Sequence, residues 1–170
     1  MKISSNKIIV LDGAKGAGKS TTSNLLRGEL KDYAFLSMDT QRYAISGSTT
    51  NDYYNDIAFK SIVALIRFYL SKNISIVIDS GLKKERLDTL KILSEEFSVK
   101  VILVYLSCPK DELWDRVKKR DEERGKVSDK KRFDYVYEIQ QSKDFQNHIE
   151  IDTFKNNSET VIKNIISILN

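Results

Sequence analysis

One eight-residue segment near the N-terminus constrains the fold more than any other part of the chain. It runs from Gly13 to Ser20 with the sequence GAKGAGKS, which satisfies every fixed position of the pattern G-x-x-x-x-G-K-[ST]. The stretch before it, residues 7–11 (KIIVL), predicts a buried strand, and residues 19–31 predict a helix. Glycines in such a turn let successive backbone N–H groups point inward, and the helix N-terminus adds partial positive charge. The segment therefore predicts a phosphate-binding loop, or P-loop.

The side chains of this loop indicate a nucleoside triphosphate as the ligand. Lys19 would reach the β- and γ-phosphates, and the Ser20 hydroxyl would bind Mg²⁺. Lys15 either touches phosphate or stays in solvent. The chain lacks an Asn-Lys-x-Asp signature, which favours adenine as the base. We therefore expect ATP to bind through Gly13, Ala14, Lys15, Gly16, Ala17, Gly18, Lys19, Ser20 and Thr21.

Strands and helices are predicted to alternate along the chain. The expected strands are residues 7–11, 33–37, 74–78, 100–106 and 148–152, and the expected helices are 19–31, 51–71, 83–97, 111–120, 132–146 and 158–169. Residues 121–131 are dense in charge and contain Gly125, which predicts a loop or a short broken helix. Together with the P-loop, the alternation predicts an α/β fold: a single P-loop NTPase domain over residues 1–170, with a five-stranded parallel sheet and helices on both faces. Residues 120–132 would form an arginine-bearing lid.

The composition fits one soluble domain, with 170 residues of which 41% are hydrophobic and 31% charged. The net charge of +4 suits nucleotides or nucleic acid as partners, although a Lys-rich surface alone gives the same balance. The single cysteine, Cys108, excludes an internal disulfide framework and favours a reducing compartment. No signal peptide is visible, and the longest apolar stretch, residues 62–70, is too short to span a bilayer. We therefore expect a cytoplasmic protein without a membrane partner.

Two carboxylates follow expected strands at the edge where parallel sheets bind ligands. Asp79 ends the third expected strand, where it would face Mg²⁺ at the P-loop or cap the next helix. Asp39 follows the second expected strand in the sequence Asp39-Thr-Gln-Arg42. This carboxylate could accept the proton of an attacking hydroxyl while Arg42 orients the acceptor. An Asx-turn with a surface arginine is the alternative, and spacing alone does not separate the two.

Three arginines recur every four residues on the helix that leads into the expected lid: Arg116, Arg120 and Arg124. Guanidinium groups there can stabilise charge on transferring phosphoryl oxygens. The acidic residues around them could instead pair with them on a solvated face. We expect at least one arginine to be catalytic, with Arg120 as the favoured candidate.

In these residues the chain resembles the small P-loop kinases, an AAA_33-like family, and is most similar to the phage-type polynucleotide 5′-hydroxyl kinases. That family combines the P-loop, an Asp-x-x-Arg after the second strand, a strand ending in Asp-[ST] with a later arginine, and a lid with two arginines four apart. The corresponding residues here are GAKGAGKS, Asp39 to Arg42, Asp79-Ser80 with Arg86, and Arg116 with Arg120. The resemblance covers nearly the whole chain in order and spacing.

The resemblance implies ATP- and Mg²⁺-dependent phosphorylation of a hydroxyl group, with the 5′-hydroxyl of a nucleic acid as the leading acceptor. It implies catalytic roles for Lys19, Asp39 as general base, and Arg120, and a metal site at Ser20 and Asp79. ATP would also contact Arg116, Asp152 and Thr153, the last two in a loop that resembles the one flanking adenine. The acceptor would be bound by Asp39, Arg42, Asp79 and Arg86.

Other acceptors and another functional class stay open at this point. The run Ser80-Gly-Leu-Lys83-Lys84 resembles gluconate-type kinases, and the opening Leu11-Asp12-Gly13 resembles thymidylate kinases, whose Asp-Arg-[Tyr/His] motif is absent at Asp79. The alternative is therefore a small-molecule kinase acting on a nucleoside, nucleotide, sugar acid or antibiotic. A nucleotide-binding switch or NTPase module is the alternative of another class, against which Asp39 and the lid arginines argue.

Overall fold

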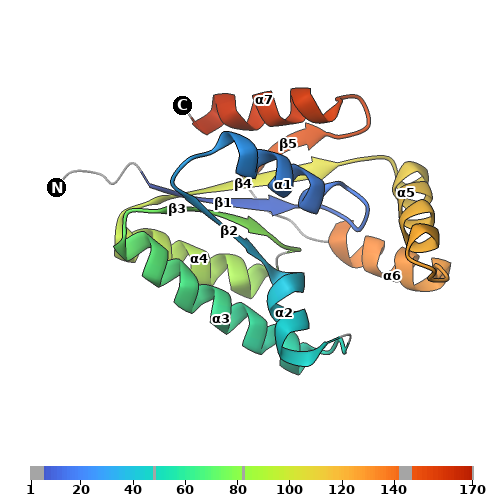
Figure 1. Cartoon of the computed structure of the whole chain (residues 1–170), viewed down its shortest axis with the longest axis horizontal. Helices are drawn as coiled ribbons and strands as arrows, with labels where there is room; N and C mark the ends of the chain where they lie inside the picture. Colours follow the sequence, from blue (N-terminus) through green and yellow to red (C-terminus); the bar gives the residue numbers. More distant parts are fainter. Residues whose placement is uncertain (1–5, 48, 82, 142–146, 170) are drawn as a thin grey trace.

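A parallel β-sheet forms the centre of the structure, a computed structural model that describes residues 6–47, 49–81, 83–141 and 147–169 (Figure 1). Within those residues the sheet has five strands in the order β2-β3-β1-β4-β5, every neighbouring pair parallel. The strands are β1 (Lys7–Asp12), β2 (Tyr33–Ser37), β3 (Ser75–Asp79), β4 (Lys100–Ser107) and β5 (Ile149–Asp152). The expected five-stranded parallel sheet is confirmed.

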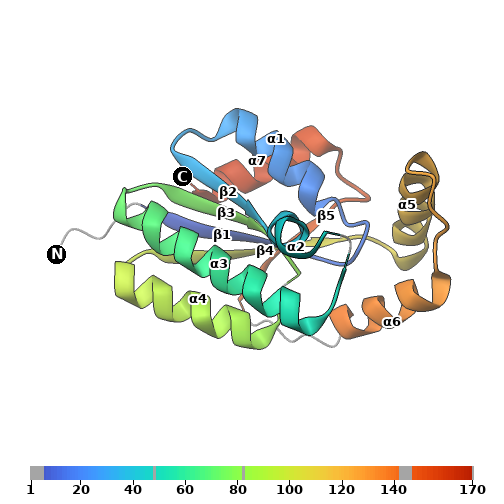
Figure 2. The same cartoon turned by 60° about the horizontal axis from the view of Figure 1, so that its bottom comes forward.

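Helices cover both faces of this sheet, as predicted. On one face lie α1 (Lys19–Glu29) and α7 (Ser158–Leu169), and on the other lie α3 (Asp52–Ser71) and α4 (Lys84–Phe97) (Figures 1 and 2). No helix in the described part of the chain is long and apolar enough to cross a membrane. Because both faces are covered, β1 and β3 must be apolar on both sides, which explains their continuous hydrophobic runs.

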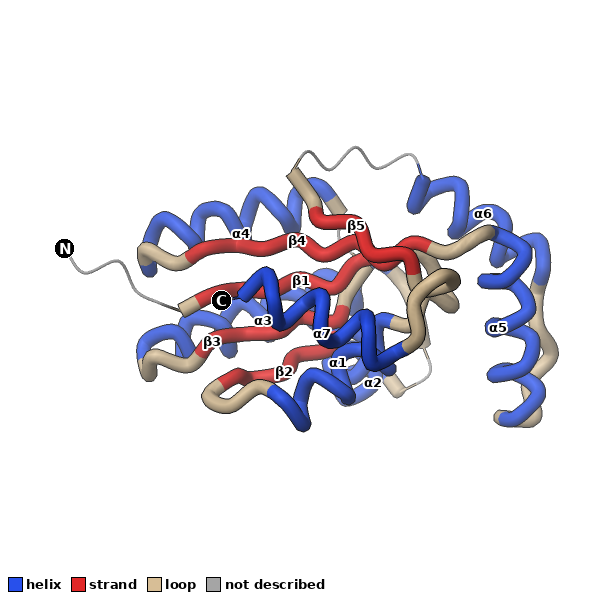
Figure 3. Tube along the Cα trace, turned by 90° about the horizontal axis from the view of Figure 1, so that it is seen from above, coloured by secondary structure: helices blue, strands red, loops and turns tan. Residues whose placement is uncertain are grey.

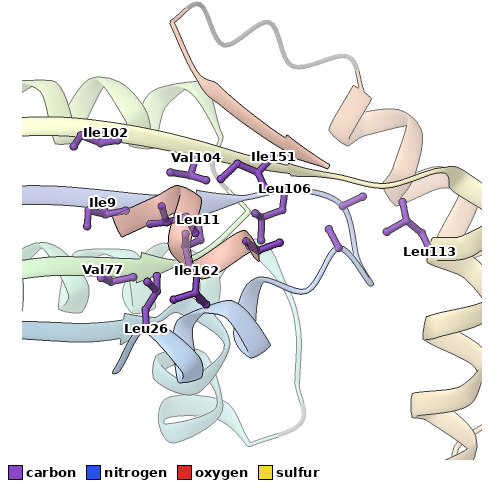
Figure 4. Packing of buried hydrophobic residues seen from close by; sticks show 14 of the residues in the cluster. Ile9, Leu11, Leu26, Val77, Ile102, Val104, Leu106, Leu113, Ile151 and Ile162 are labelled. Carbon is purple, nitrogen blue, oxygen red and sulfur yellow. The ribbon is translucent and has the colours of Figure 1, made fainter. Parts of the chain in front are cut away.

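The strands divide the core into two layers because successive side chains point to opposite faces. Ile9, Leu11 and Val77 pack with Leu26 of α1 and Ile162 of α7 (Figure 4). The alternate positions, among them Ile8, Val10 and Ile78, pack with α3 and α4 on the other face. The next residue of β1 after Leu11, Asp12, is therefore expected on the α3–α4 side, at the end of the strand.

One short helix was not predicted. The helix α2 (Met38–Ser46) begins immediately after β2, and the Ser37 hydroxyl accepts a hydrogen bond from the Thr40 N–H at 3.4 Å. Asp39 and Arg42 therefore lie one helical turn apart on α2. The alternative of an isolated turn at these residues is wrong, because the Ser37 cap starts a helix there.

The helices α5 (Lys110–Glu123) and α6 (Lys130–Gln141) lie beyond the carboxyl ends of the strands (Figure 3). The helix α5 continues three residues past the predicted end, so the expected loop over 121–131 is shortened to residues 124–129. Gly125 has φ +64° and the Lys126 N–H donates to the Asp121 carbonyl oxygen at 2.8 Å, a left-handed termination typical of helix ends. The predicted continuation of α6 over 142–146 lies outside the described residues.

Candidate functional site

The backbone of the P-loop requires glycine at two positions. At Gly13, φ is +145° and a Cβ atom would lie 2.5 Å from the Leu106 carbonyl oxygen. At Gly16, φ is +93° and a Cβ atom would lie 2.8 Å from the Leu113 carbonyl oxygen. The loop is thus pressed against the end of β4 and the first turns of α5, which explains two of the glycines in the motif.

Lys19 is half-buried at the first turn of α1 and has several charged side chains near it. Its Nζ atom donates to the carbonyl oxygens of Gly13 at 2.8 Å and Ala14 at 3.1 Å. Burial lowers the pKa of Lys19, whereas the carboxylates Asp79, Asp12 and Asp39 raise it and Arg120 lowers it. The predicted catalytic residues Lys19, Asp39 and Arg120 are therefore electrostatic neighbours, although they come from three different helices.

Asp79 ends β3 beside the start of α1. Burial raises the pKa of Asp79, while a hydrogen bond with the Ser20 side chain and the Lys19 charge lower it. The two residues expected to hold Mg²⁺, Ser20 and Asp79, are thus in contact. A hydroxyl and a carboxylate oxygen suit Mg²⁺, which takes one or two protein ligands and completes its shell with phosphates and water. The residues present fit the metal.

Asp39 and Arg42 form an ion pair at the start of α2, with 3.3 Å between Asp39 Oδ1 and Arg42 Nη2. The Asp39 side chain is 91% exposed and that of Arg42 is 15% exposed. Arg42 Nη1 also donates to the Thr49 carbonyl oxygen at 3.1 Å. The arginine is therefore fixed by its surroundings, while the carboxylate it holds faces solvent and is open to an acceptor.

The two arginines of α5 expected at the site have different surroundings. Arg116 donates to Glu112 at 2.8 Å and to both oxygens of Thr153, in the loop that follows β5. Arg120 has one hydrogen bond, a long one of 3.5 Å to Asp121, and its Nε atom is buried without a partner among the described residues. A buried guanidinium N–H without an acceptor is unfavourable unless a ligand supplies one.

Three further predicted site residues already have protein partners. Asp152 Oδ1 accepts hydrogen bonds from the N–H groups of Phe154 and Lys155, which hold the loop after β5 and keep the pKa of Asp152 below its usual range. Lys15 Nζ lies 3.6 Å from Asp121 Oδ2 of α5. The sequence had offered either a phosphate contact or a solvated side chain for Lys15, and neither included this ion pair. Thr153 donates to the Ser107 carbonyl oxygen at 3.1 Å.

Arg86 is the predicted site residue that the structure does not bring to the P-loop cluster. Its Nη2 atom donates to the Asn55 carbonyl oxygen at 3.3 Å, and its guanidinium carbon lies 5.2 Å from the centre of the Phe59 ring. Burial lowers its pKa, and the carboxylates that counter this are Asp56, Asp52 and Glu85. Arg86 lines a cleft of about 640 Å³ between the first turns of α3 and α4.

Two buried polar residues at the site were not predicted. Asp12 is fully buried at the end of β1, and its Oδ1 atom accepts from the Gly13 N–H and from Gln140 Nε2, both at 2.7 Å. Asp12 ends an apolar strand just as Asp79 does, so the same signal could have found it. Gln140 lies on α6, 128 residues away, and carries no comparable signal in the sequence.

A cavity of about 280 Å³ lies behind the P-loop, beside Ala14 and between β4, β5 and α6. Tyr105, Tyr137, His148 and Glu150 are among its lining residues, but Lys19, Asp39, Asp79 and Arg120 are not. The cavity is therefore separate from the charged cluster around Lys19, which is the candidate site.

Comparison with known proteins identifies the family of the chain. Residues 8–135 match the model of the family AAA_33, described as an AAA domain, over well more than half of the chain. No curated protein sequence is significantly similar to the chain.

Several solved structures share the fold. A chain of the Pnkp1/Rnl/Hen1 RNA repair complex superimposes with a TM-score of 0.69 at 22% identity, over 80% of this chain and 44% of that one, so the present chain spans less than half of it. A putative kinase from Chloroflexus aurantiacus gives 0.74 at 17% identity, over 96% and 98% of the two chains. The Mycobacterium tuberculosis APS kinase CysC, in complex with AMPPNP and APS, gives 0.70 at 13% identity, over 96% and 97%. At these identities the likeness establishes the P-loop kinase fold.

Proposed function

We propose that this chain, which belongs to the AAA_33 family of AAA domains, is a kinase that transfers the γ-phosphoryl group of ATP to an acceptor hydroxyl in the presence of Mg²⁺. The observation that carries the proposal is the charged environment of Lys19, in which Asp79, Asp39 and Arg120 are its neighbours. Such a set supplies a phosphate ligand, a metal ligand, a base and a charge stabiliser around one point.

The donor side of this site would hold ATP between the P-loop and the loop after β5. The backbone N–H groups of residues 13–21 would bind the phosphates, with Lys19 at the β- and γ-phosphates. The contact of Arg116 with Thr153 places a guanidinium group beside the loop proposed to flank adenine. Mg²⁺, when bound by Ser20 and Asp79, would neutralise charge on the β- and γ-phosphates.

The acceptor side would be built on α2. The acceptor oxygen attacks the γ-phosphorus while its proton passes to the Asp39 carboxylate. The bond between the γ-phosphorus and the bridging oxygen breaks, and ADP leaves. Arg120, whose Nε atom is buried without a partner among the described residues, would donate to the transferring phosphoryl oxygens.

A nucleic-acid 5′-hydroxyl is the acceptor that we favour. The charge of +4 suits a polyanion, and the Asp39–Arg42 pair matches the motif of the polynucleotide kinases. Tyr43 adds a structural reason, because it lies one helical turn after Asp39 and is 66% exposed. Residues four apart on a helix share a face, so a nucleoside whose 5′-hydroxyl reaches Asp39 can stack on this ring.

A small-molecule acceptor is the second candidate, because the APS kinase of similar fold has been solved in complex with AMPPNP and APS. A switch or NTPase is favoured less, because an exposed carboxylate such as Asp39 suits an acceptor hydroxyl.

The test is transfer of label from γ-labelled ATP in the presence of Mg²⁺. The acceptors are 5′-hydroxyl DNA and RNA oligonucleotides, the same oligonucleotides with a 5′-phosphate as blocked controls, and a panel of nucleosides, sugar acids, adenylyl sulfate and nucleoside antibiotics. The variant Lys19→Ala serves as the control for contaminating kinases.

We expect label in the 5′-hydroxyl oligonucleotides and none in the blocked ones. Label in a small molecule instead would transfer the proposal to the second candidate. Hydrolysis of ATP at the same rate with and without every acceptor would contradict the kinase and favour an NTPase.

A further inference from the structure

A continuous chain of hydrogen bonds leads from α6 to the P-loop lysine. Gln140 Nε2 donates to Asp12 Oδ1 at 2.7 Å, and the Gly13 N–H donates to the same oxygen at 2.7 Å. The Gly13 carbonyl oxygen then accepts from Lys19 Nζ at 2.8 Å. Three bonds therefore join the helix that follows the expected lid to the side chain proposed to hold the transferring phosphate.

Gly13 lies in a close-packed position where a larger residue would not fit. Its φ of +145° is open to few other residues, and a Cβ atom would meet the Leu106 carbonyl oxygen. Gly13 is also hydrogen-bonded on both sides, to Asp12 through its N–H group and to Lys19 through its carbonyl oxygen.

The carboxylate at the centre of this chain is costly for the fold. Asp12 is 0% exposed, and its Oδ2 atom has no hydrogen-bond partner among the described residues. Ser80 directly follows Asp79, the last residue of the neighbouring strand β3. Its side chain is also buried, and its Oγ atom has no hydrogen-bond partner in the described part of the chain. Buried charge with incomplete hydrogen bonding destabilises a fold, so its presence beside a ligand site points to a role in function.

We propose that Asp12 is a positioning residue for the phosphoryl transfer, which connects the docking of α6 through Gln140 to the position of Gly13 and Lys19. This inference rests on the proposed function. Asp12 does not touch ATP; it holds the first peptide of the P-loop, and it provides one of the negative charges that favour the ammonium form of Lys19. Gln140 on α6 completes the environment of Asp12 and thereby orients Gly13 and Lys19 for the transfer step rather than for ATP binding.

The decisive variants separate hydrogen bonding from folding. Asp12→Leu removes both hydrogen bonds with a side chain of similar size and leaves the buried Gly13 and Gln140 donors without an acceptor, so we expect a lower Tm together with a kcat at least about tenfold lower. Asp12→Asn keeps an oxygen acceptor, and we expect it to retain kcat within about threefold of the wild type. A purely structural role predicts instead that kcat, measured at a temperature well below the Tm of each variant, stays at the wild-type value.

Two glutamines on α6 provide a matched pair. Gln140→Met removes the donor to Asp12, whereas Gln141→Met removes a donor that bonds the Tyr105 hydroxyl at 3.2 Å, one residue along the same helix. We expect kcat about tenfold lower in Gln140→Met, within about twofold in Gln141→Met, and an ATP Kd within about threefold in both. Equal effects of the two substitutions, or full activity of Asp12→Leu, would overturn the inference. This pair also decides the question if Asp12→Leu does not fold.

A second measurement keeps the inference distinct from the proposed function. Amide hydrogen exchange of α6 is followed with and without the ATP analogue AMPPNP. We expect slower exchange on binding in the wild type and in Gln141→Met, and a smaller effect in Gln140→Met. If the wild type phosphorylates no acceptor, the proposed function fails. The connection between α6 and the P-loop would then be supported by the smaller effect of AMPPNP on exchange in Gln140→Met than in the wild type. Unchanged exchange of α6 in the wild type overturns it.

Discussion

The guanidinium group of Arg116 binds both oxygens of Thr153, with Nη1 at 3.3 Å from Oγ1 and Nη2 at 3.0 Å from the carbonyl oxygen. The Thr153 N–H donates to the Ser107 carbonyl oxygen at 2.9 Å. The contact therefore ties α5 to the loop after β5 and to the end of β4. The planar fork of arginine makes this double contact, which the single ammonium group of lysine cannot reproduce.

Replacing Arg116 by lysine tests whether this contact serves ATP binding. In Arg116→Lys we expect the KM for ATP to rise about tenfold, equivalent to the loss of one charged hydrogen bond, with kcat within about twofold. Arg124→Lys, at the exposed end of the same helix, is the control and should leave both constants unchanged. A fall in kcat with an unaltered KM would place Arg116 in the transfer step instead.

Asp39→Asn tests the proposed general base. The substitution keeps the shape of the side chain but removes the proton acceptor, so we expect kcat to fall at least about 100-fold while the Kd for ATP changes less than about twofold. The fold should not be affected, since the ion pair with Arg42 involves a 91% exposed carboxylate and such pairs contribute little. Asp88→Asn on α4, which breaks an exposed pair with Lys91, is the matched control. Transfer at the wild-type rate in Asp39→Asn would exclude the base.

The sequence was sufficient for the order of the elements because each of β1, β3 and β4 is an apolar run bounded by polar residues. It also predicted that Asp39 and Asp79 lie near the P-loop, since both stand where strands end at the same edge of a parallel sheet. The helix α2 was missed because it is short, and its start depends on the Ser37 cap rather than on apolar periodicity.

Contacts between distant segments were beyond sequence reasoning. Gln140 is one polar residue among several on α6, and only the fold brings it to Asp12. Arg86 was expected to bind the acceptor, which stays a prediction; the contacts of its guanidinium group with Asn55 and Phe59 of α3 are set by the packing of α3 against α4. Tertiary packing decides both cases, and no local pattern encodes it.

Asp79→Asn tests the electrostatic strain at the buried carboxylate proposed to bind Mg²⁺. Burial raises the pKa of Asp79, so the neutral carboxyl stabilises the fold; this contribution is complete below the unfolded pKa of about 3.9 and is lost as pH rises through the folded pKa. Asparagine stays neutral, and without nucleotide we expect its Tm to exceed that of the wild type at about pH 7 and the difference to shrink toward about pH 4. Asp88→Asn should show no such trend. A Tm difference that is constant across this range would contradict the assignment.

Two glycines allow the P-loop backbone to be tested against a matched control. In Gly13→Ala the new Cβ atom would lie 2.5 Å from the Leu106 carbonyl oxygen at a φ of +145°, so we expect a loss of at least about 2 kcal/mol in the free energy of unfolding and no measurable ATP binding. Gly28 lies inside α1, where an added Cβ atom would meet no neighbouring atom within 4 Å, and Gly28→Ala should gain about 0.5–1 kcal/mol through helix propensity. Denaturant unfolding and ATP titration of both variants measure these effects. Both substitutions add the same methyl group, so changes of opposite sign in the free energy of unfolding would show that the loop position requires glycine. ATP binding by Gly13→Ala at the wild-type Kd would exclude this requirement.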